Sequence, residues 1–294
     1  MIAVEGAMGT RVDLSRPALR VVSLVPSETE AVWLLGAGTR VVGRTDYCVQ
    51  PTGAVEAIAT VGGTKDADPE KILALAPDLV LMNQEENTEG IYRALAGRVP
   101  VHLSFPRTVA DAVALVRDLA RLLGMDPDRH PVVRDLEAAV AQAEAARAKV
   151  TPVRVFCPIW MDPCMTIHGE TFISDVLDLA GGTNVFADRP RRYPLAADLG
   201  LRPAWDAARV GTRDVRYPRV TLDEVVERAP EVVLLPDEPH PFTEADAAVF
   251  RALPIPAARS GRVHRVDGRD LSWYSPRMGL GIRRVARYLA PPPP

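Results

Sequence analysis

The sequence predicts an α/β protein of two similar lobes, and three observations support that fold class. The same segment occurs twice: residues 70–81 read Glu-Lys-Ile-Leu-Ala-Leu-Ala-Pro-Asp-Leu-Val-Leu, and residues 223–234 read Asp-Glu-Val-Val-Glu-Arg-Ala-Pro-Glu-Val-Val-Leu. Short apolar runs typical of buried strands alternate with helical patterns. Between the two copies, residues 131–150 contain no glycine and no internal proline. A repeated unit implies two related lobes, and paired lobes commonly bind a ligand between them.

Length and composition exclude several classes of protein. The 294 residues exceed the roughly 100–200 residues of a typical domain, and 47% of them are hydrophobic, enough for two cores. The net charge of -3 gives no electrostatic reason to expect a nucleic acid or an anionic membrane as partner. No run approaches about 18 consecutive apolar residues, so no transmembrane helix is expected. Three cysteines are too few for a disulfide framework.

The first lobe begins with a parallel strand-helix-strand unit. Residues 20–26 predict a buried strand that ends in a turn. Ser27-Glu-Thr-Glu30 predicts a capping box, in which Ser27 caps a helix and Glu30 reaches back. The helix is expected to end at residues 36–38, Gly-Ala-Gly, before a second strand over residues 41–43.

The rest of the first lobe repeats this alternation. We expect, in order, a helix over 69–75, a strand over 79–82, a helix from about Glu86, a strand over 99–103 and an amphipathic helix over 108–123. Pro69 suits a first helical position, and Pro77 cannot extend the helix that precedes it.

Residues 131–150 predict a helix of about 30 Å, the span of a small domain. We interpret it as a rigid bridge between the lobes, because a strand-like run over residues 153–156 follows directly. The alternative is one more surface helix of the first lobe. The predicted organisation is a polar tail (1–19), an N-terminal α/β lobe (20–124), a connecting helix (125–151), a C-terminal α/β lobe (152–290) and a disordered tail (291–294).

The second lobe mirrors the first. A helix is expected over 172–179, and the glycine turn at 181–185 resembles the one at 36–41. An arginine-rich polar stretch at 195–216 predicts an inserted surface loop. A last strand over 262–266 and a closing helix over 278–289 complete the lobe.

Motifs for catalysis and metal binding are absent from the sequence. Gly62-Gly-Thr-Lys65 lacks the spacing of a phosphate-binding loop, and no His-Glu-x-x-His or Gly-x-Ser-x-Gly occurs. Cys157, Cys164 and His168 are the only group resembling a zinc site, but structural zinc normally takes four ligands, so buried or partly exposed thiols are the favoured interpretation. We therefore predict no enzyme, no catalytic residue and no metal site of the protein's own, and whether a side chain coordinates the metal of a ligand stays open.

Aromatic residues gather at predicted strand ends in both lobes. They are Tyr47, Trp160, Tyr217, Trp273 and Tyr274. Aromatic side chains at loop tips can line the site of a large flat ligand, because each offers a broad apolar face with few torsions to order. Local packing is the alternative for each one taken singly.

Glu70 and Asp223 occupy equivalent places in the two copies of the repeat. The helix macrodipole favours a carboxylate at a helix N-terminus, so capping explains each of them alone. Their equivalence also permits a symmetric acidic pair that docks on a partner with two basic patches.

Seven sequence blocks together resemble a known family. They resemble the cobalamin-binding and iron-siderophore-binding proteins of ABC importers, most closely the vitamin B12-binding branch, over about residues 20–289. The blocks are Arg20-Val-Val-Ser-Leu-Val-Pro-Ser-x-Thr-Glu30, Gly43-Arg-Thr-Asp-Tyr47, Val61-Gly-Gly63, Glu70-Lys-Ile-Leu-Ala-Leu-Ala-Pro-Asp-Leu-Val80, Gly181-Gly-x-Asn-Val-Phe186, Tyr217-Pro-Arg-Val-Thr-Leu-Asp223 and Trp273-Tyr-Ser-Pro-Arg277.

The resemblance implies two Rossmann-like α/β lobes joined by one long rigid helix, with a ligand cleft between the lobes. It also implies that Tyr47 and Tyr217 line a corrinoid pocket bordered by Asp270 and Trp273. Candidate ligand-binding residues are Pro26, Ser27, Tyr47, Gly63, Asn83, Trp160, Tyr217, Asp270 and Trp273. Glu70 and Asp223 are expected to pair with arginines of the membrane permease.

The favoured function is noncovalent binding of a corrinoid (cobalamin) or related metal chelate, as transported ligand, and its delivery to an ABC import permease by a monomer. Alternatives are a cytoplasmic corrinoid or metal-chelate carrier or sensor, and an iron-siderophore or haem-binding protein. A chelatase-like enzyme using His168 and Cys164 is less favoured. Family members are periplasmic or anchored at the cell surface, whereas no secretory signal or lipid-bearing cysteine is visible near Met1, so the location is left open.

Overall fold

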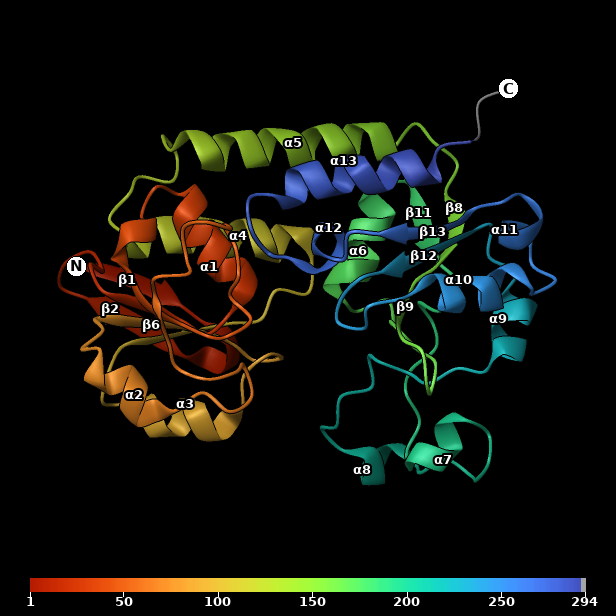
Figure 1. The fold of residues 1–294 in the computed structure, drawn as a ribbon, viewed down its shortest axis with the longest axis horizontal. Coiled ribbons are helices and arrows are strands. Elements are labelled where there is room, and N and C mark those ends of the chain that lie inside the picture. The colour runs from red at the N-terminus through yellow and green to blue at the C-terminus, as the bar shows by residue number, and fades with distance from the viewer. Residues whose placement is uncertain (292–294) are drawn as a thin grey trace. The chain divides into compact units, whose positions relative to one another are not determined.

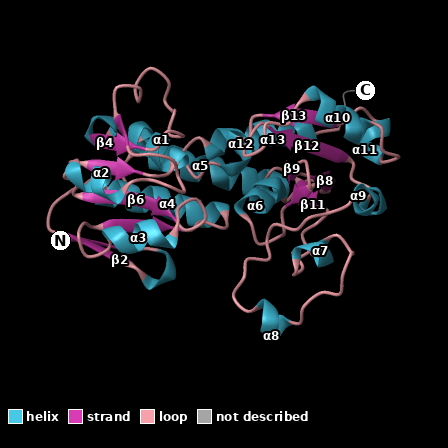
Figure 2. Cartoon of the chain, turned by 60° about the horizontal axis from the view of Figure 1, so that its bottom comes forward, coloured by secondary structure: helices cyan, strands magenta, loops and turns pink. Residues whose placement is uncertain are grey.

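The structure is a computed structural model that describes residues 1–291 and divides into two compact units. Unit 1 comprises Met1–Ala138 and Trp273–Arg277, and unit 2 comprises Ala139–Ser272 and the chain from Met278 onward. Each unit contains a parallel sheet with helices packed against it, which confirms the predicted α/β class (Figure 1, Figure 2). Apart from Pro291, the predicted disordered tail lies outside the described residues.

The sheet of unit 1 is entirely parallel, in the order β5-β4-β3-β6-β7. The first of these strands in the chain, β3, is the central one, and Val21 and Val22 on it are fully buried. Strands covered on both faces are expected to be continuously apolar, as β6 is up to its last residue, Asn83. The strands are β3 (Val21–Ser23), β4 (Val41–Arg44), β5 (Ala59–Thr60), β6 (Leu79–Asn83) and β7 (Val101–Ser104).

Helices cover both faces of this sheet (Figure 1). On one face, Ile72 of α2 and Ile91 and Leu95 of α3 join one apolar cluster with Val80 and Met82 of β6. The helices are α1 (Pro26–Leu34), α2 (Pro69–Ala74), α3 (Glu89–Leu95) and α4 (Val109–Leu122), with short 3-10 turns η1 (Ala7–Gly9) and η2 (Gly38–Arg40). All four α-helices lie where the sequence places them to within a few residues.

The predicted capping box at Ser27 and Glu30 is wrong. Helix α1 starts two residues earlier than a Ser27 cap implies, at Pro26, because the fixed φ of proline suits the first turn, and its N-cap Val25 supplies no side-chain cap. The Glu30 carboxylate instead accepts a hydrogen bond from Ser275 Oγ and lies 3.3 Å from Nε of Arg277. The segment Trp273–Arg277 is therefore fixed to unit 1 through α1.

Residues 1–19, expected to be a polar tail, contain an antiparallel hairpin. Strand β1 (Ile2–Glu5) pairs with β2 (Arg11–Leu14), and Val4 faces Val12 across the pair. Val4, Val12 and Leu14 are buried while their neighbours in the strands are more exposed. This alternation is the period-two pattern of a half-buried strand.

The sheet of unit 2 is a smaller parallel sheet in the order β11-β8-β12-β13. Phe156 of β8 packs its ring 5.4 Å from that of Phe186 and 5.7 Å from that of Phe250, at the centre of the apolar core. Its strands are β8 (Val153–Phe156), β11 (Gly182–Asn184), β12 (Val232–Pro236) and β13 (Val263–Val266), and a separate hairpin is formed by β9 (Pro158–Trp160) and β10 (Met165–Thr166).

The helices of unit 2 also lie on both faces of its sheet (Figure 2). Val225 of α9, Phe250 of α10 and Ala257 of α11 belong to the core on one face. On the other, a Cβ atom on Gly182 would lie 3.0 Å from Leu289 of α13 and 3.1 Å from the Leu177 carbonyl of α6, so the glycine allows both helices to approach β11. The helices are α6 (Phe172–Leu179), α7 (Leu195–Asp198), α8 (Ala207–Val210), α9 (Leu222–Arg228), α10 (Glu244–Arg251), α11 (Pro256–Arg259), α12 (Arg269–Ser272) and α13 (Met278–Leu289).

The long helix expected between the lobes is α5 (Pro131–Arg147), and the boundary between the units falls inside it, after Ala138. Glu137 accepts a hydrogen bond from Arg117 Nη1 at 2.5 Å within unit 1. Arg147 donates to Asp178 at 2.9 Å within unit 2. None of the helices in residues 1–291 combines the length and apolar character that a membrane span requires.

The repeated Ala-Pro pair is a helix-to-strand joint. Ala76 and Ala229 have positive φ values of 46° and 44° and end α2 and α9 in the left-handed conformation. In unit 1, Arg20 donates from Nη2 to the Leu75 carbonyl at 2.6 Å and from Nε to the Ala76 carbonyl at 3.0 Å. These bonds satisfy carbonyls that have no partner within the helix.

Unit 2 forms the same joint with different residues. Arg154 donates from Nη2 to the Arg228 carbonyl and from Nε to that of Ala229. The acid that follows each proline completes the joint, because Asp78 accepts from the Arg20 amide at 2.9 Å and Glu231 from the Arg154 amide at 2.9 Å. The repeat in the sequence is thus a repeat of hydrogen bonds.

We predict that Ala76→Gly and Ala229→Gly each raise the free energy of unfolding by roughly 0.5–1 kcal/mol, because glycine adopts positive φ without the Cβ clash. Chemical denaturation measures the change. The matched control is Ala248→Gly, an exposed position inside α10, which should destabilise by about 1 kcal/mol. Destabilisation by all three substitutions would contradict the assigned backbone conformation.

Candidate ligand-binding surfaces at the strand ends

In each sheet there is one pair of neighbouring strands from which the chain continues toward opposite edges of the sheet. In unit 1 this pair is β3 and β6, and in unit 2 it is β8 and β12. Ligands of open parallel sheets bind outside the carboxyl ends of the strands at such a switch point. The loops after these four strands are therefore the candidate surfaces, and each unit is described by itself.

In unit 1, Asn87 ties together the loops beyond the strand ends. Its Nδ2 donates to the Leu24 carbonyl at 3.2 Å, after β3, and to the Thr64 carbonyl at 2.9 Å, after β5. Its Oδ1 accepts from the Asn83 amide at 2.8 Å. The sequence analysis did not single out Asn87, although a polar residue that follows a buried strand closely was a usable signal.

Two predicted ligand residues of this surface, Pro26 and Ser27, open helix α1. Pro26 is half-buried, and Ser27 is only 2% exposed. In the described part of the chain, no hydrogen-bond partner exists for Ser27 Oγ. A buried hydroxyl without a partner costs free energy, so a polar ligand group or a water would stabilise it.

Asn83, also predicted to contact a ligand, is fully buried. Its Nδ2 donates to Ser104 Oγ at 3.1 Å, and its Oδ1 accepts from the amides of Glu85 and Glu86 at 2.8 and 3.2 Å. The structure therefore gives Asn83 the role of shaping the turn after β6, because its amide group is used internally.

Glu28 and His102 are buried titratable groups beneath this surface. Ser104 Oγ donates to Glu28 Oε1, while burial raises the pKa of Glu28 to about 8. Burial also lowers the pKa of His102 to about 4, so both side chains are uncharged at neutral pH. Neither residue was recognised in the sequence.

Tyr47 and Gly63 are brought together by the fold. Tyr47 follows β4 and is 64% exposed, an unusual exposure for an aromatic residue in an ordered loop. A Cβ atom on Gly63 would lie 3.2 Å from Cε2 of Tyr47, so the glycine makes room for the ring. The ring is held in place at one edge and leaves most of its surface open.

In unit 2, Trp160 and His240 meet at the switch point. Trp160 ends β9, shortly after β8, and His240 follows β12; their ring centroids lie 5.2 Å apart. His240 in turn packs edge-on against Phe242 at 4.6 Å. Trp160 is 44% exposed, and its Nε1 donates to the Asp162 carbonyl at 3.1 Å. His240 was missed because a single histidine after an apolar run carries no motif.

Tyr217 lies on an extended segment beside β10. The amides of Thr166 and His168 donate to the carbonyls of Pro218 and Arg216 at 3.0 and 2.7 Å, which fixes the segment on either side of Tyr217. The ring is half-buried, with the Arg216 guanidinium 5.4 Å from its centroid.

The remaining two predicted ligand residues are largely buried. Asp270, in α12, is 7% exposed, and its carboxylate oxygens lie 3.3 and 3.4 Å from Arg284 Nη1. Trp273 is also 7% exposed and belongs to unit 1, where the Arg277 guanidinium lies 5.8 Å from its ring.

The proposed docking acids differ in their surroundings. Both occupy the second position of their helices, α2 and α9. Arg98 Nη1 donates to Glu70 Oε1 at 2.6 Å, and this bond lowers the pKa of Glu70. For Asp223, which is exposed, residues 1–291 provide no side-chain hydrogen bond or ion pair. Glu70 is thus neutralised locally while Asp223 stays open.

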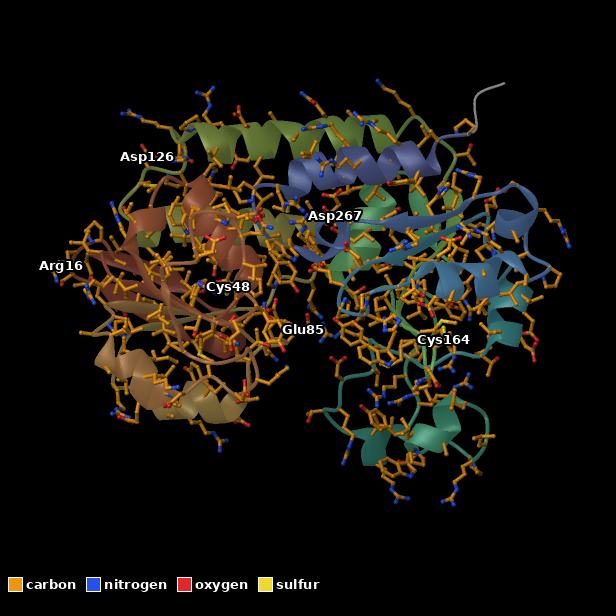
Figure 3. All side chains as sticks on the ribbon, viewed as in Figure 1. Arg16, Cys48, Glu85, Asp126, Cys164 and Asp267 are labelled. Carbon is orange, nitrogen blue, oxygen red and sulfur yellow. The ribbon has the colours of Figure 1, made fainter. Side chains whose placement is uncertain are left out.

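The three thiols are all buried (Cys48 and Cys164 are labelled in Figure 3). Burial raises the pKa of both Cys157 and Cys164 to about 12, which removes thiolate character. His168 Nδ1 accepts from the Glu170 amide at 3.2 Å. Across the described residues, no group of three or more His, Cys, Asp or Glu side chains is suited to hold a metal ion.

Comparison with known proteins decides the family. The family model described as "Periplasmic binding protein" matches residues 21–268. The chain belongs to the periplasmic binding protein family. Within it, the chain falls among relatives named for vitamin B12, haem and iron, as its resemblance indicated.

Individual relatives of this family cover almost the whole chain. A vitamin B12-binding protein of Yersinia pestis is 25% identical over 280 residues, which are 94% of this chain and 88% of that protein. The fold also matches the periplasmic vitamin B12 binding protein BtuF of Vibrio cholerae (TM-score 0.71, 22% identity, 93% and 97% of the two chains). A periplasmic haem-binding protein of Roseiflexus sp. RS-1, RhuT, gives a TM-score of 0.72 at 21% identity over 92% and 97%.

Periplasmic binding proteins bind solutes and are not enzymes, so the chain is a solute-binding protein. Its candidate surfaces agree with that role in chemical terms. They present aromatic rings, a buried hydroxyl and the uncharged carboxyl group of Glu28.

Glu28 makes stability depend on pH in a defined window. Its folded pKa of about 8 exceeds the ordinary 4.5, so the folded state holds a proton that the unfolded state has lost, and stability falls as pH rises toward 8. His102 has the opposite effect, losing stability as pH falls from 6.5 through about 4. Comparison with Glu28→Gln isolates the Glu28 contribution, because the variant keeps His102 and the buried thiols.

We therefore predict that the free energy of unfolding drops by about 2 kcal/mol more in the wild type than in Glu28→Gln between pH 6.5 and 8.5. Urea titrations at the two pH values measure it. Glu89→Gln, which changes an exposed glutamate paired with Arg93 on α3, should keep the wild-type slope. Parallel profiles for wild type and Glu28→Gln would show that Glu28 is ionised in the folded protein.

Proposed function

We propose that this protein binds a corrinoid such as cobalamin, or a closely related metal chelate, and delivers it to an ABC import permease. The relative from Yersinia pestis named a vitamin B12-binding protein supports the ligand class. The single structural observation that carries the proposal is the exposed aromatic ring beyond the strand ends of each unit, Tyr47 and Trp160.

The chemistry of a corrinoid suits these residues. Its broad, largely apolar ring offers two faces that aromatic side chains can cover, while its amide-bearing edge needs hydrogen-bonding groups. Tyr47 and Trp160 would contact the ring with little ordering cost, because their loops already fix them. Ser27 Oγ, buried without a partner among the described residues, supplies a polar contact. Tyr217 and Asp270 stay predicted ligand contacts.

Haem is a second candidate because the Roseiflexus protein of the same fold is a haem-binding protein. A porphyrin would use the same exposed rings, and the Tyr47 phenol is a group that can ligate haem iron. The two ligands are separated by direct competition.

Titration with cyanocobalamin, haem and a ferric siderophore, followed by calorimetry, tests the proposal. We expect saturable binding of cobalamin, and about tenfold weaker binding in Tyr47→Ala and in Trp160→Ala, since each lost ring contact is worth about 1.4 kcal/mol. Tyr288→Ala is the matched control, because Tyr288 is 37% exposed but lies on α13 against His264. Absence of binding to all three chelates would overturn the proposal.

Delivery is proposed to use Glu70 and Asp223 as contacts for basic residues of the permease. Because Arg98 already neutralises Glu70, a permease arginine must displace it, whereas Asp223 is available at once. Charge complementarity of this kind mainly sets encounter rate and orientation.

We predict that Asp223→Asn weakens association with the purified permease about tenfold, and that Arg98→Gln strengthens it by freeing Glu70. Surface plasmon resonance at low salt measures both. Glu227→Gln, at another exposed acid of α9, is the control and should leave association unchanged. Equal effects of Asp223→Asn and Glu227→Gln would indicate a general charge effect instead of docking.

A further inference from the structure

The segment 189–219 of unit 2 carries a charge opposite to that of the chain. It contains eight arginines and three aspartates, and neither lysine nor glutamate, so its formal charge is +5 in a protein of net charge -3. It includes the short helices α7 and α8, which extend from the rest of unit 2 (Figure 1). The positive charge is therefore concentrated in the inserted region.

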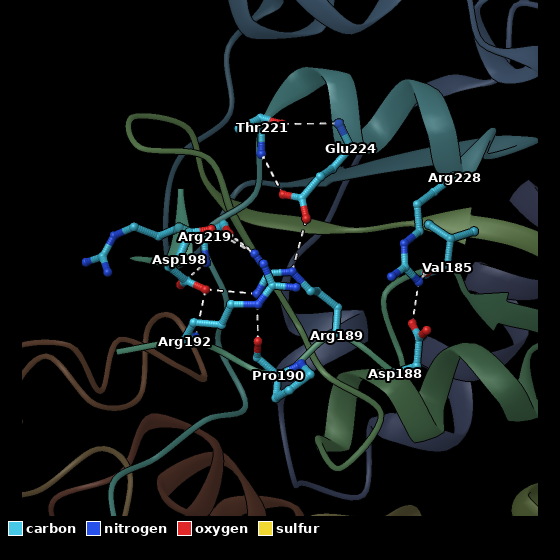
Figure 4. Close-up of polar contacts among 10 residues, drawn as sticks. All are labelled: Val185, Asp188, Arg189, Pro190, Arg192, Asp198, Arg219, Thr221, Glu224 and Arg228. Carbon is cyan, nitrogen blue, oxygen red and sulfur yellow. Dashed lines mark hydrogen bonds and ion pairs between the residues drawn. The ribbon is translucent and has the colours of Figure 1, made fainter. Parts of the chain in front are cut away.

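One of these positive charges, that of Arg189, is paired with carboxylates inside the protein (Figure 4). Its side chain is 3% exposed, and all five of its N–H groups are used: one bond goes to Glu224, two to Asp198 and one each to the Pro190 and Arg219 carbonyls. A buried ion pair with complete hydrogen bonding organises the insertion, and removing one partner would leave a buried charge.

Asp198, the buried carboxylate of this segment, forms its ion pair with Arg189. Its Oδ1 accepts from Arg189 Nη1 at 2.9 Å and from the Arg192 amide at 2.8 Å. Its Oδ2 accepts from the Arg219 amide at 2.7 Å. Asp198 thus forms an ion pair with Arg189 and a hydrogen bond with the Arg219 amide, and its charge acts on the Arg219 guanidinium only from a distance.

Three more arginines have clear local roles. Arg216 pairs with Asp214 at 2.7 Å, and Arg213 donates to the carbonyls of Arg209 and Val210. Arg209 stacks 4.2 Å above the ring of Trp205, which is itself stacked on Tyr193. These contacts hold the insertion together.

Arg191 and Arg219 differ from these arginines because their guanidinium groups keep unsatisfied hydrogen-bond donors among the described residues. In the part of the chain that the structure describes, neither guanidinium has a carboxylate partner, and Nε of Arg191 together with Nε and Nη1 of Arg219 are buried without a hydrogen bond. The two groups influence each other, since the charge of Arg191 contributes to a lowered pKa of Arg219, after the larger effect of burial. Arg191 also lies 5.1 Å from the Tyr193 ring. Both residues are half-buried, so part of each reaches the surface.

We infer that Arg191 and Arg219 form a binding site for a compact oxyanion of the phosphate class. Two neighbouring cations with unsatisfied donors are an unfavourable arrangement that a bound anion relieves by charge and by hydrogen bonds. Guanidinium groups match the tetrahedral oxygens of phosphate with several parallel N–H donors, and the Tyr193 ring screens one side from water. The site goes beyond the proposed chelate contacts, since Arg191, Tyr193 and Arg219 are not among them.

Inorganic phosphate is the first probe. Phosphorus-31 NMR and thermal unfolding at constant ionic strength should show saturation at millimolar phosphate, with a rise of a few degrees in Tm that chloride does not give. Arg219→Gln and Arg191→Gln should each weaken phosphate binding at least tenfold, and Arg219→Lys should restore only part of it. High phosphate stabilises many proteins nonspecifically, so saturation and dependence on these two residues are the criteria.

Arg202→Gln is the matched control, since it removes one exposed positive charge from the same segment and should keep wild-type binding. The inference is overturned if Arg191→Gln and Arg219→Gln respond to phosphate like the wild type, or if Arg202→Gln loses as much. Circular dichroism and Tyr193–Trp205 near-ultraviolet signals identify a variant whose insertion has unfolded. In that case the Arg219→Lys titration decides, because it retains the charge.

A second arm separates free phosphate from a phosphate carried by the ligand, and this arm alone rests on the proposed function. Cobalamin contains a phosphodiester that cobinamide lacks. If the site takes that phosphodiester, Arg219→Gln reduces the affinity for cobalamin about tenfold more than the affinity for cobinamide. If both affinities stay unchanged while phosphate binding is lost, the site serves a free anion. Loss of chelate binding by the wild type removes the proposed function and leaves the phosphate result standing.

Discussion

In both units, the hydrogen-bonded joint between helix and strand at the repeated Ala-Pro pair holds together the starts of two neighbouring strands. In unit 1 the Arg20 side chain caps α2 while the amides of Leu19 and Arg20 bind Asp78, so the starts of β3 and β6 are held together. Arg154 and Glu231 do the same for β8 and β12. These are the strand pairs that flank the switch points. The hydrogen bonds at their amino ends therefore fix which loops meet at their carboxyl ends, where Asn87, Trp160 and His240 lie.

The two units form equivalent helix-to-strand joints, but the segments added to each unit differ. Their capping arginines and post-proline acids correspond, yet unit 1 adds an N-terminal hairpin and unit 2 adds the arginine-rich insertion. Buried chemistry also differs, since unit 1 keeps an uncharged Glu28 beneath its strand ends and unit 2 keeps a row of aromatic rings. The surfaces suited to ligand contact are thus not copies of one another.

Much of the fold was predictable, because the apolar periodicity of helices and strands and the Gly and Pro residues that end them are local features of the sequence. The helix over 172–179 and the closing helix over 278–289 were predicted at their observed bounds. The capping box at Ser27 failed since Pro26 outcompetes a serine cap for the first turn. The hairpin at residues 2–14 has a period-two pattern of burial, but each strand has only four residues and the segment is polar, so the pattern was not recognised in the sequence. Predicted ligand residues such as Asn83 proved buried because their hydrogen-bond partners, Ser104 among them, come from elsewhere in the chain. No local pattern reveals the Ser275 contact with Glu30, made across 245 residues.

That last contact bears on how the protein can be synthesised and dissected. Unit 1 is completed only by Trp273–Arg277, so the ribosome must translate nearly the entire polypeptide before its N-terminal half can close. Until then Glu30, which is 9% exposed in the folded protein, lacks its partners Ser275 and Arg277. A fragment cut at Ala138 would lack this last piece, and a circular permutant opened near residue 272 would supply it first.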